Sequence, residues 1–319
     1  MTPSGSPRPK LVVLSGPTGV GKTSLAVALA QRFGAEIISA DSMQIYRYMD
    51  IGTAKPTSAE KAKVKHHLVD VVDPDQDFDV AAYLALARPL ISELHDHGIP
   101  ILVAGGTGFY LRSLIRGLFD GPASDPAIRA RLKEEARASS KETLHARLAQ
   151  VDPDAAARLH PNDLFRVIRA LEVFELTGRP ISSFQIEHNL AENPYQVLFC
   201  ALTLPREELY RRIEVRTGQM LDAGLVEEVR GLLDRGYTPD LNPLKSIGYK
   251  QIVEFFAGTM DLDQTKTEII RMTKRYAKRQ MTWLRSQPDI HRFSYGDDEA
   301  VMDKVSGFWE RSGPLRETE

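Results

Sequence analysis

The sequence predicts an α/β protein whose parallel sheet is flanked by helices and whose chain contains an inserted all-helical subdomain. Short apolar runs alternate with longer helical patterns over the first 117 residues, an order typical of a parallel sheet with helices on both faces. Strand-like segments are then absent for about 75 residues, and a strand signal returns at 196–204. We therefore expect an α/β core of residues 10–117 and 195–319, which carries C-terminal helices, and a helical insertion of residues 118–194.

Four apolar runs in the first part of the chain predict strands, because each is short and bounded by turn residues. They lie at 11–14, 36–40, 68–72 and 99–104. Helical patterns cover 24–33 and 79–97, and Gly98 is a stop signal for the second. These runs are expected to form most of the sheet.

Proline after an acidic residue marks helix starts in the insertion. Asp125-Pro126 begins a helix that runs toward Ser139, Asp152-Pro153 begins another, and Asn162 or Asp163 begins a third that ends at Gly178. After the returning strand, helical patterns cover 207–234, 246–256 and 262–286, and residues 289–295 are expected to form a late edge strand.

The composition is that of an ordinary globular protein, with 319 residues, 42% hydrophobic and 26% charged. A single cysteine, Cys200, excludes an internal disulfide and a cysteine-rich zinc site, and it fits a cytoplasmic location. Residues 1–9 are expected to form a disordered tail, and no apolar stretch approaches the ~20 residues of a membrane span. Because the net charge is only -2, a nucleic-acid partner would have to meet a local basic surface.

A phosphate-binding P-loop lies between the first predicted strand and the first predicted helix, which is the context that this motif requires. It reads Gly16-Pro17-Thr18-Gly19-Val20-Gly21-Lys22-Thr23. Backbone N–H groups of its second half can surround a di- or triphosphate, Lys22 adds positive charge, and the Thr23 hydroxyl can ligate Mg²⁺. The motif makes the predicted sheet P-loop NTPase-like and leaves open whose phosphates are bound.

Asp41 is the acidic residue that the topology places beside this loop. The strand at 99–104 ends in Gly105-Gly106-Thr107-Gly108, without the Asp that would hold Mg²⁺ in a motor or signalling NTPase. Asp41 instead follows the strand at 36–40, at the carboxyl edge of the sheet where ligands bind. Three interpretations remain open for it: an N-cap or Asx turn, a Mg²⁺ ligand, and a general base.

A strongly basic segment lies in the predicted helix 262–286. Residues 269–285 contain six basic residues and no acidic one: Arg271, Lys274, Arg275, Lys278, Arg279 and Arg285. At helical spacing four of them fall close to one face, while Met272, Tyr276, Trp283 and Leu284 can face the protein body. Solvated faces usually mix both signs, so the segment favours contact with nucleic-acid phosphates. Two weaker basic pairs, Arg166 with Arg169 and Lys245 with Lys250, could extend this surface.

Six signatures, in order along nearly the whole chain, resemble the tRNA dimethylallyltransferase family, whose bacterial-type members prenylate adenosine 37 of tRNA. They are the P-loop, Asp41-Ser42-Met43-Gln44-Ile45-Tyr46, Met49-Asp50-Ile51-Gly52-Thr53-Ala54-Lys55-Pro56, Gly105-Gly106-Thr107-Gly108-Phe109-Tyr110, His160-Pro161-Asn162-Asp163 and Ala277-Lys278-Arg279-Gln280-Met281-Thr282-Trp283. Because the zinc-finger extension of many eukaryotic relatives is missing, we expect the shorter bacterial form.

The resemblance implies that a dimethylallyl group is transferred from dimethylallyl diphosphate to N6 of adenosine 37, with release of diphosphate. It places the diphosphate and Mg²⁺ in the P-loop, and Arg216 looks like the family's additional diphosphate-contacting arginine, although by itself it reads as an ordinary exposed helix residue. Asp41 is then the general base, and Thr107 orients the amine or the diphosphate. An N-cap role for Thr107 is compatible with this.

The resemblance further implies a tRNA-binding surface, with the insertion clasping the anticodon stem-loop. Asp41, Ser42, Met43, Gln44 and Thr107 are expected at the entrance for an extruded base. The other expected tRNA-binding residues are Arg129, Phe165, Arg166, Val167, Ile168, Arg169, Lys245, Ser246, Ile247, Gly248, Tyr249, Lys250, Thr273, Lys274, Arg275, Tyr276, Ala277, Lys278, Arg279 and Gln280. The family likeness also favours a cytoplasmic monomer without a membrane contact or an obligate protein partner.

Two other functions share the P-loop. A small-molecule or nucleotide kinase would transfer a phosphoryl group from ATP and would not need the basic helix. A non-catalytic RNA-binding protein with a P-loop switch would show nucleotide-dependent affinity and form no modified product. Incubation with tRNA and either labelled dimethylallyl diphosphate or labelled ATP distinguishes the three functions, because they differ in which label is transferred to the RNA.

Overall fold

The computed structural model describes residues 8–119, 121–188 and 194–310, and it divides into two compact units. The first comprises residues 1–115 and 194–319, and the second comprises residues 116–193. The predicted tail at residues 1–9 falls almost wholly outside the described residues. In the described part of the chain, no helix combines the length and apolar character needed to cross a membrane.

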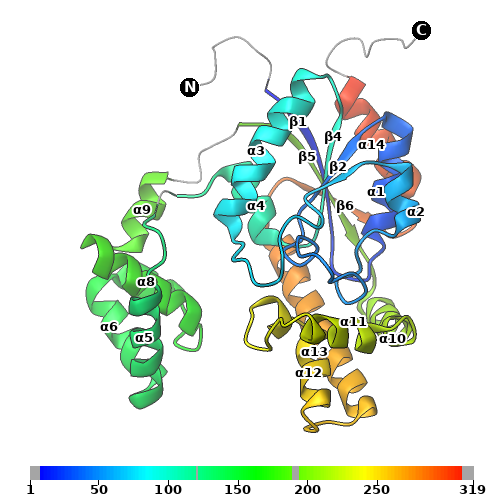
Figure 1. The fold of residues 1–319 in the computed structure, drawn as a ribbon. Coiled ribbons are helices and arrows are strands. Elements are labelled where there is room, and N and C mark those ends of the chain that lie inside the picture. The colour runs from blue at the N-terminus through cyan, green and yellow to red at the C-terminus, as the bar shows by residue number, and fades with distance from the viewer. Residues whose placement is uncertain (1–7, 120, 189–193, 311–319) are drawn as a thin grey trace. The chain divides into compact units, whose positions relative to one another are not determined.

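The first unit is built on a six-stranded, all-parallel sheet, which confirms the predicted fold class (Figure 1). The strand order is β3-β2-β4-β1-β5-β6. The strands are β1 Lys10–Ser15, β2 Glu36–Ser39, β3 His66–His67, β4 Ile101–Ala104, β5 Gln196–Thr203 and β6 Ile290–Ser294. Sequence order and sheet order differ most at the centre, where β1 lies between β4 and β5. The carboxyl ends of these three strands therefore meet at one edge.

Helices cover both faces of the sheet. α1 (Lys22–Phe33) and α14 (Asp298–Glu310) pack on one face, where Val12 and Leu14 of β1 enter the same apolar cluster as Leu29 of α1. α3 (Val80–Asp96) and α4 (Gly108–Arg116) lie on the opposite side (Figure 1). The two-residue alternation of β1 thus sends successive side chains into different layers. Every residue from Leu11 to Leu14 is fully buried as a result.

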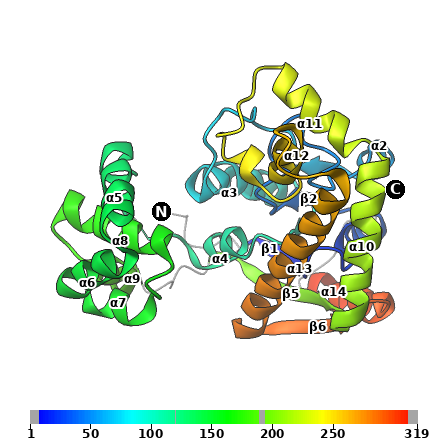
Figure 2. The same ribbon diagram turned by 90° about the horizontal axis from the view of Figure 1, so that it is seen from below.

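The short helix α2 (Ser58–Lys63) packs beside α1 (Figure 1). The remaining helices of the first unit extend from the carboxyl edge of the sheet. They are α10 (Arg206–Asp222), α11 (Leu225–Asp234), α12 (Tyr249–Phe256) and α13 (Leu262–Ser286), together with the 3-10 turn η1 (Pro243–Lys245). α13 packs against both α10 and α12 (Figure 2). A second apolar cluster joins α11, α12 and Ile269 of α13 to Ile45 and Met49 in the segment that follows β2.

The second unit is all-helical and has its own apolar core. It contains α5 (Pro126–Ala138), α6 (Lys141–Val151), α7 (Pro153–Arg158), α8 (Leu164–Thr177) and α9 (Ile181–His188). Asp125 caps α5, and its Oδ1 accepts hydrogen bonds from the N–H groups of Ala127 and Ile128 at 2.8 and 3.0 Å. Gly178 ends α8 in the left-handed conformation, with φ of 69°. Both boundaries were predicted, whereas α6 and α9 were not.

One predicted strand is wrong. Residues 68–72 do not form a strand: Leu68 and Asp70 have φ values of 58° and 59°, and the strand at this edge is the two-residue β3. The apolar pattern misled because Leu68, Val71 and Val72 pack on the second cluster from a loop. The helical pattern at 207–234 also divides, into α10 and α11, at Gly224 with φ of 98°. The helices α2, α4 and α14 were not predicted.

Candidate active site

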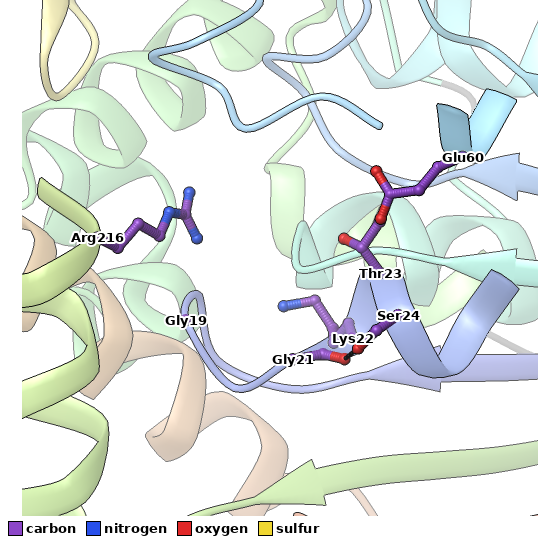
Figure 3. Close-up of a pocket in the computed structure, with 7 residues that line it drawn as sticks. All are labelled: Gly19, Gly21, Lys22, Thr23, Ser24, Glu60 and Arg216. Carbon is purple, nitrogen blue, oxygen red and sulfur yellow. Dashed lines mark hydrogen bonds between the residues drawn. The ribbon is translucent and has the colours of Figure 1, made fainter. Parts of the chain in front are cut away.

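The P-loop joins β1 to α1 and lines a small pocket. Gly19 and Gly21 have φ values of 83° and 100°, which a residue with a side chain adopts only with strain. The pocket has a volume of about 310 Å³ and is lined by Gly19, Gly21, Lys22, Thr23, Ser24, Glu60 and Arg216 (Figure 3). Of the other predicted P-loop residues, Gly16, Pro17 and Val20 are buried, and Thr18 is half-buried.

Lys22 and Arg216 bring two positive charges to this pocket from different elements (Figure 3). Lys22 Nζ donates hydrogen bonds to the carbonyl oxygens of Gly16 and Pro17 at 2.9 and 3.0 Å. Arg216 extends from α10, and its Nη1 lies 3.2 Å from Thr18 Oγ1, to which it donates. The structure therefore places the predicted arginine at the P-loop, although it is 193 residues further along the chain than Thr23.

Burial changes the charge behaviour of both cations. It lowers the pKa of Lys22 to about 8; the negative charge of Asp41 opposes this shift and the positive charge of Arg216 adds to it. Burial also lowers the pKa of Arg216, again against the effect of Asp41. Asp41 thus lies close enough to act on both cations, as its position after β2 predicted.

Asp41 and Thr107 lie on two turns that are hydrogen-bonded together. Asp41 Oδ1 accepts the Met43 N–H at 2.9 Å, so the Asx turn considered from the sequence is present. Thr107 Oγ1 accepts the Ser42 N–H at 3.0 Å, and the Thr107 N–H donates to the Ala40 carbonyl at 3.1 Å. The Thr107 side chain is therefore bonded to the Asp41 turn.

Tyr276 of α13 is one of the residues of this helix that contact these turns. Its hydroxyl interacts with Thr107, and burial together with the charge of Asp41 raises the pKa of this phenol. At pH 7 the phenol is a neutral hydrogen-bonding group. Sequence reasoning gave Tyr276 both as a residue that can face the protein body and as an expected tRNA contact.

The segment that contains Ser42, Met43 and Gln44 is held in place by residues that the sequence did not single out. Gln44 Nε2 donates to the carbonyl oxygen of Ala54 at 3.1 Å, which ties the start of the segment to residues 50–54. The carboxylate of Glu228 accepts the N–H groups of Asp50, Ile51 and Gly52 at 2.8, 2.7 and 3.1 Å. No local pattern in the sequence around Glu228 would have revealed this role.

Lys55 is a buried cation that ties residue 50 of this segment to the loop at residue 70. Its ammonium group is almost fully buried and contacts Asp50 and Asp70 at 2.7 and 2.5 Å. The cationic residue in the 49–56 signature is therefore structural.

The expected tRNA-binding residues of α13 divide between two faces. Arg275, Lys278 and Arg279 are exposed and make no ion pair within the described residues, and Thr273 is half-buried. Lys274 pairs with Glu214 of α10 at 2.5 Å. Ala277 and Gln280 are buried, and this burial keeps their side chains away from any ligand on the exposed face.

The second group of expected tRNA contacts surrounds the start of α12. Lys245 and Lys250 are exposed, and Ser246 and Ile247 are half-buried. Gly248 and Tyr249 are buried instead, and the Tyr249 hydroxyl donates to Glu228 Oε1 at 2.6 Å. Lys245 is therefore available to a phosphate, whereas Lys250 is paired with Glu254 at 3.6 Å.

In the helical unit, a buried carboxylate organises two of the expected arginines. Glu172 is fully buried; Arg129 Nε donates to its Oε1 at 2.8 Å and Arg169 Nη1 to its Oε2 at 2.7 Å. Hydrogen bonds from both arginines hold the pKa of Glu172 below its usual value despite burial. Their side chains remain partly exposed, at 30% for Arg129 and 24% for Arg169.

The other expected tRNA contacts of the helical unit comprise two exposed and two buried residues. Phe165 is 75% exposed and Arg166 is exposed, so both can meet a ligand. Val167 and Ile168 belong to the apolar core of the unit, which places both side chains away from solvent.

Thr23 is the one residue predicted to hold a metal, and Glu60 lines the same pocket (Figure 3). Glu60 belongs to α2, and its Oε2 accepts hydrogen bonds from Thr57 N and Oγ1 at 2.7 and 2.8 Å. The sequence did contain a signal for α2, because Thr57-Ser58-Ala59-Glu60 is a capping box. Among the described residues, no group of three or more His, Cys, Asp or Glu side chains could hold a metal alone.

Comparison with known proteins gives a consistent family. The IPP transferase model matches residues 44–287, and the isopentenyl transferase model matches residues 9–72. The tRNA dimethylallyltransferase of Geobacter sulfurreducens is 51% identical over 297 residues, which cover 93% of this chain and 94% of that protein. The tRNA dimethylallyltransferase 2 of Syntrophus aciditrophicus is 49% identical over 301 residues, which cover 94% of this chain and 97% of that protein.

Two solved structures resemble the fold along almost the whole chain. The tRNA isopentenylpyrophosphate transferase of Bacillus halodurans matches with a TM-score of 0.72 and 38% identity, over 95% of this chain and 98% of that one. A eukaryotic dimethylallyltransferase, described as acting on tRNA, matches with a TM-score of 0.78 and 26% identity, over 97% of this chain and 81% of that one.

Proposed function

This chain belongs to the IPP transferase family, and on that premise we propose that it transfers a dimethylallyl group from dimethylallyl diphosphate to N6 of adenosine 37 in the tRNA anticodon loop. It is a prenyltransferase that acts in tRNA modification. The observation that carries the proposal is the site itself, where Asp41 acts electrostatically on the two cations, Lys22 and Arg216, that line the P-loop pocket.

The donor diphosphate would bind in the P-loop pocket. The Lys22 ammonium has three N–H donors, and two of them are used by the carbonyl oxygens of its own loop. The third remains for a phosphate oxygen, and Arg216 supplies further donors from the other side of the pocket (Figure 3). When the carbon–oxygen bond breaks, negative charge grows on the departing diphosphate. Donors that are already fixed around it then stabilise the transition state more than the ground state.

Mg²⁺ fits the residues that line this pocket. Protein-bound Mg²⁺ usually retains several waters and takes one or two protein oxygens together with substrate phosphates. The Thr23 hydroxyl and the free carboxylate oxygen of Glu60 provide such oxygens on one side, while Lys22 and Arg216 are cationic. Thr23 would be the direct ligand and Glu60 a water-mediated one. When bound, the ion would neutralise part of the charge on the leaving diphosphate.

The acceptor amine needs a base, because N6 of adenine must lose a proton as it forms the new bond to the allylic carbon. We assign this role to Asp41, and the proton of N6 passes to its carboxylate as the diphosphate leaves. Thr107 and Tyr276 lie beside it and orient the amine or the Asp41 turn. Adenosine 37 would have to leave its stack and approach the paired turns that carry Asp41 and Thr107, past Ser42, Met43 and Gln44.

The tRNA would be held mainly through its phosphates and its shape. In the first unit, the exposed cations of α13 and Lys245 serve this purpose. In the helical unit, Arg129, Arg166, Arg169 and the exposed ring of Phe165 do so, which makes this unit the proposed clasp of the anticodon stem-loop. The buried members of the predicted set, among them Val167, Tyr249 and Ala277, support these surfaces from behind.

One assay tests the function against its two alternatives. Purified protein is incubated with unmodified tRNA and Mg²⁺, and either prenyl-labelled dimethylallyl diphosphate or γ-labelled ATP is supplied. We expect prenyl label on the RNA and stoichiometric release of diphosphate. Phosphoryl label on any product would favour a kinase, and nucleotide-dependent RNA binding without a product would favour an RNA-binding switch. Either result overturns the proposal.

A further inference from the structure

Gln280 of α13 connects the P-loop to the turn that carries Thr107. Its Oε1 accepts the N–H of Thr18 at 2.8 Å, and its Nε2 donates to the carbonyl oxygen of Gly106 at 2.9 Å. The side chain is 8% exposed, so water cannot readily replace either bond. A single amide group therefore satisfies one backbone group on each side of the proposed active site.

Gln280 packs closely against the turn after β4. A Cβ atom on Gly106 would lie 2.4 Å from Gln280 Nε2, so a side chain at position 106 would displace the amide from its present position. On the other side, Thr18 is held twice, because Gln280 binds its N–H and Arg216 donates to its Oγ1 at 3.2 Å. Direct hydrogen bonds join the ends of β1 and β4, from Gly105 N to the Leu14 carbonyl at 3.1 Å and from Ser15 Oγ to the Gly105 carbonyl at 2.8 Å. Gln280 adds the side-chain link between Thr18, further along the P-loop, and the turn that carries Thr107.

The same helix presents cations on its other face. Arg275, Lys278 and Arg279 lie within about one and a half turns of Gln280; they are exposed and have no ion-pair partner in the described ranges. Tyr276, one turn before Gln280, interacts with Thr107. A ligand that displaces α13 would therefore also move the amide that holds the P-loop and the Thr107 turn.

We propose that Gln280 is a positioning residue that couples tRNA binding on α13 to diphosphate binding in the P-loop. This inference rests on the proposed function. It replaces the sequence-based expectation that Gln280 contacts tRNA directly, because its amide is turned inward and both its polar atoms are used. By reciprocity, tRNA should tighten diphosphate binding by the same factor by which diphosphate tightens tRNA binding.

The test compares Gln280→Met with the wild type and with Gln287→Met. Methionine keeps the approximate volume and removes both hydrogen bonds, and Gln287 is a half-buried residue at the end of the same helix, outside the site. Inorganic pyrophosphate with Mg²⁺ is titrated into each full-length protein with and without tRNA. We expect the tRNA-dependent tightening to disappear in Gln280→Met and to persist in Gln287→Met. We also expect kcat to fall about tenfold or more in Gln280→Met.

Further measurements separate positioning from direct RNA contact. The salt dependence of tRNA binding should be the same in Gln280→Met and the wild type, because no cation is removed. If Gln280→Met does not fold, Gln280→Glu is the second variant. It retains an acceptor for Thr18 but sets a charged oxygen against the Gly106 carbonyl in place of the donor, and it should show a reduced ratio of pyrophosphate affinities with and without tRNA. Unchanged coupling in the variant, or no coupling in the wild type, overturns the inference. The pyrophosphate titration does not depend on prenyl transfer, so this result is separate from the proposed activity.

Discussion

At the scale of single residues, the proposed chemistry depends on Asp41 being an anion while Lys22, in the nearby P-loop pocket, is a cation. Burial alone favours the neutral form of the lysine, and the nearby carboxylate opposes this effect. A bound diphosphate would oppose it further, because its charges lie next to the ammonium group. The free enzyme and the donor complex should therefore differ in how readily Lys22 loses its proton.

Asp41→Asn should reduce kcat by about 100-fold or more, because the amide cannot accept the N6 proton. The variant is nearly isosteric and keeps an oxygen that can accept the Met43 N–H. Single-turnover prenylation gives the rate, and separate titrations with tRNA and pyrophosphate show whether binding is preserved. Prenylation by Asp41→Asn at the wild-type rate would exclude Asp41 as the base.

The pH dependence should identify Lys22. Its pKa is lowered to about 8 in the free protein, so raising the pH above 8 removes the proton and the positive charge. kcat/KM for dimethylallyl diphosphate, at saturating tRNA, should then fall about tenfold for each further pH unit, because this constant reports the enzyme before the diphosphate binds. kcat should be less affected, since bound diphosphate raises the pKa again.

Lys22→Arg is the matched control for this profile. Its guanidinium stays charged over the whole range, so the variant should be less active but should lack the decline that begins near pH 8. An identical decline in the variant would assign it to another group.

At the scale of elements, the sequence predicted those segments whose ends carry a local chemical signal. Asp125, Gly98 and Gly178 mark helix ends by their own side chain or backbone preference, and α13 was predicted with its observed bounds. The strand predicted at 68–72 failed because its apolar residues pack from a loop. Helix α2 was detectable from its capping box, whereas the partners of Glu228 and Gln280 lie far away in sequence and depend on tertiary packing.

The exposed face of α13 gives a prediction for the helix as a whole. Lys278→Glu combined with Arg279→Glu should weaken tRNA binding and reduce the slope of log K against log salt by about one for each phosphate that the helix no longer neutralises. Neither residue forms an ion pair among the described residues, so folding should be little affected. Binding of an anticodon stem-loop measured at several salt concentrations provides the slope.

Arg271→Glu is the control for this pair. Arg271 is an exposed arginine on the same helix, but its Nη2 is already paired with Glu268 at 2.6 Å. Its contribution to RNA binding should be small, and its salt slope should remain close to that of the wild type. If the double variant keeps the wild-type slope as well, α13 is not the tRNA surface.

At the scale of the whole molecule, the two units have separate apolar cores. The core beneath the P-loop includes Leu14, Leu29 and Cys200, and the core of the helical unit includes Leu132, Leu148 and Val167. Glu172 adds a buried anchor for Arg129 and Arg169 that lies wholly in the helical unit. Because each unit has its own apolar core, donor binding and tRNA clasping should be separable.

Replacing residues 116–193 by a flexible Gly/Ser linker should therefore leave a folded α/β core. We expect this variant to bind pyrophosphate with Mg²⁺ about as well as the full chain does in the absence of tRNA, since the P-loop, Lys22 and Arg216 all belong to the retained unit. Its affinity for the anticodon stem-loop should fall strongly, because the arginines of the helical unit are gone, while the cations of α13 should leave a weak and salt-sensitive interaction. Circular dichroism and calorimetric titration measure folding and the two affinities. An unfolded core, or undiminished tRNA affinity, would show that the division of labour between the two units is wrong.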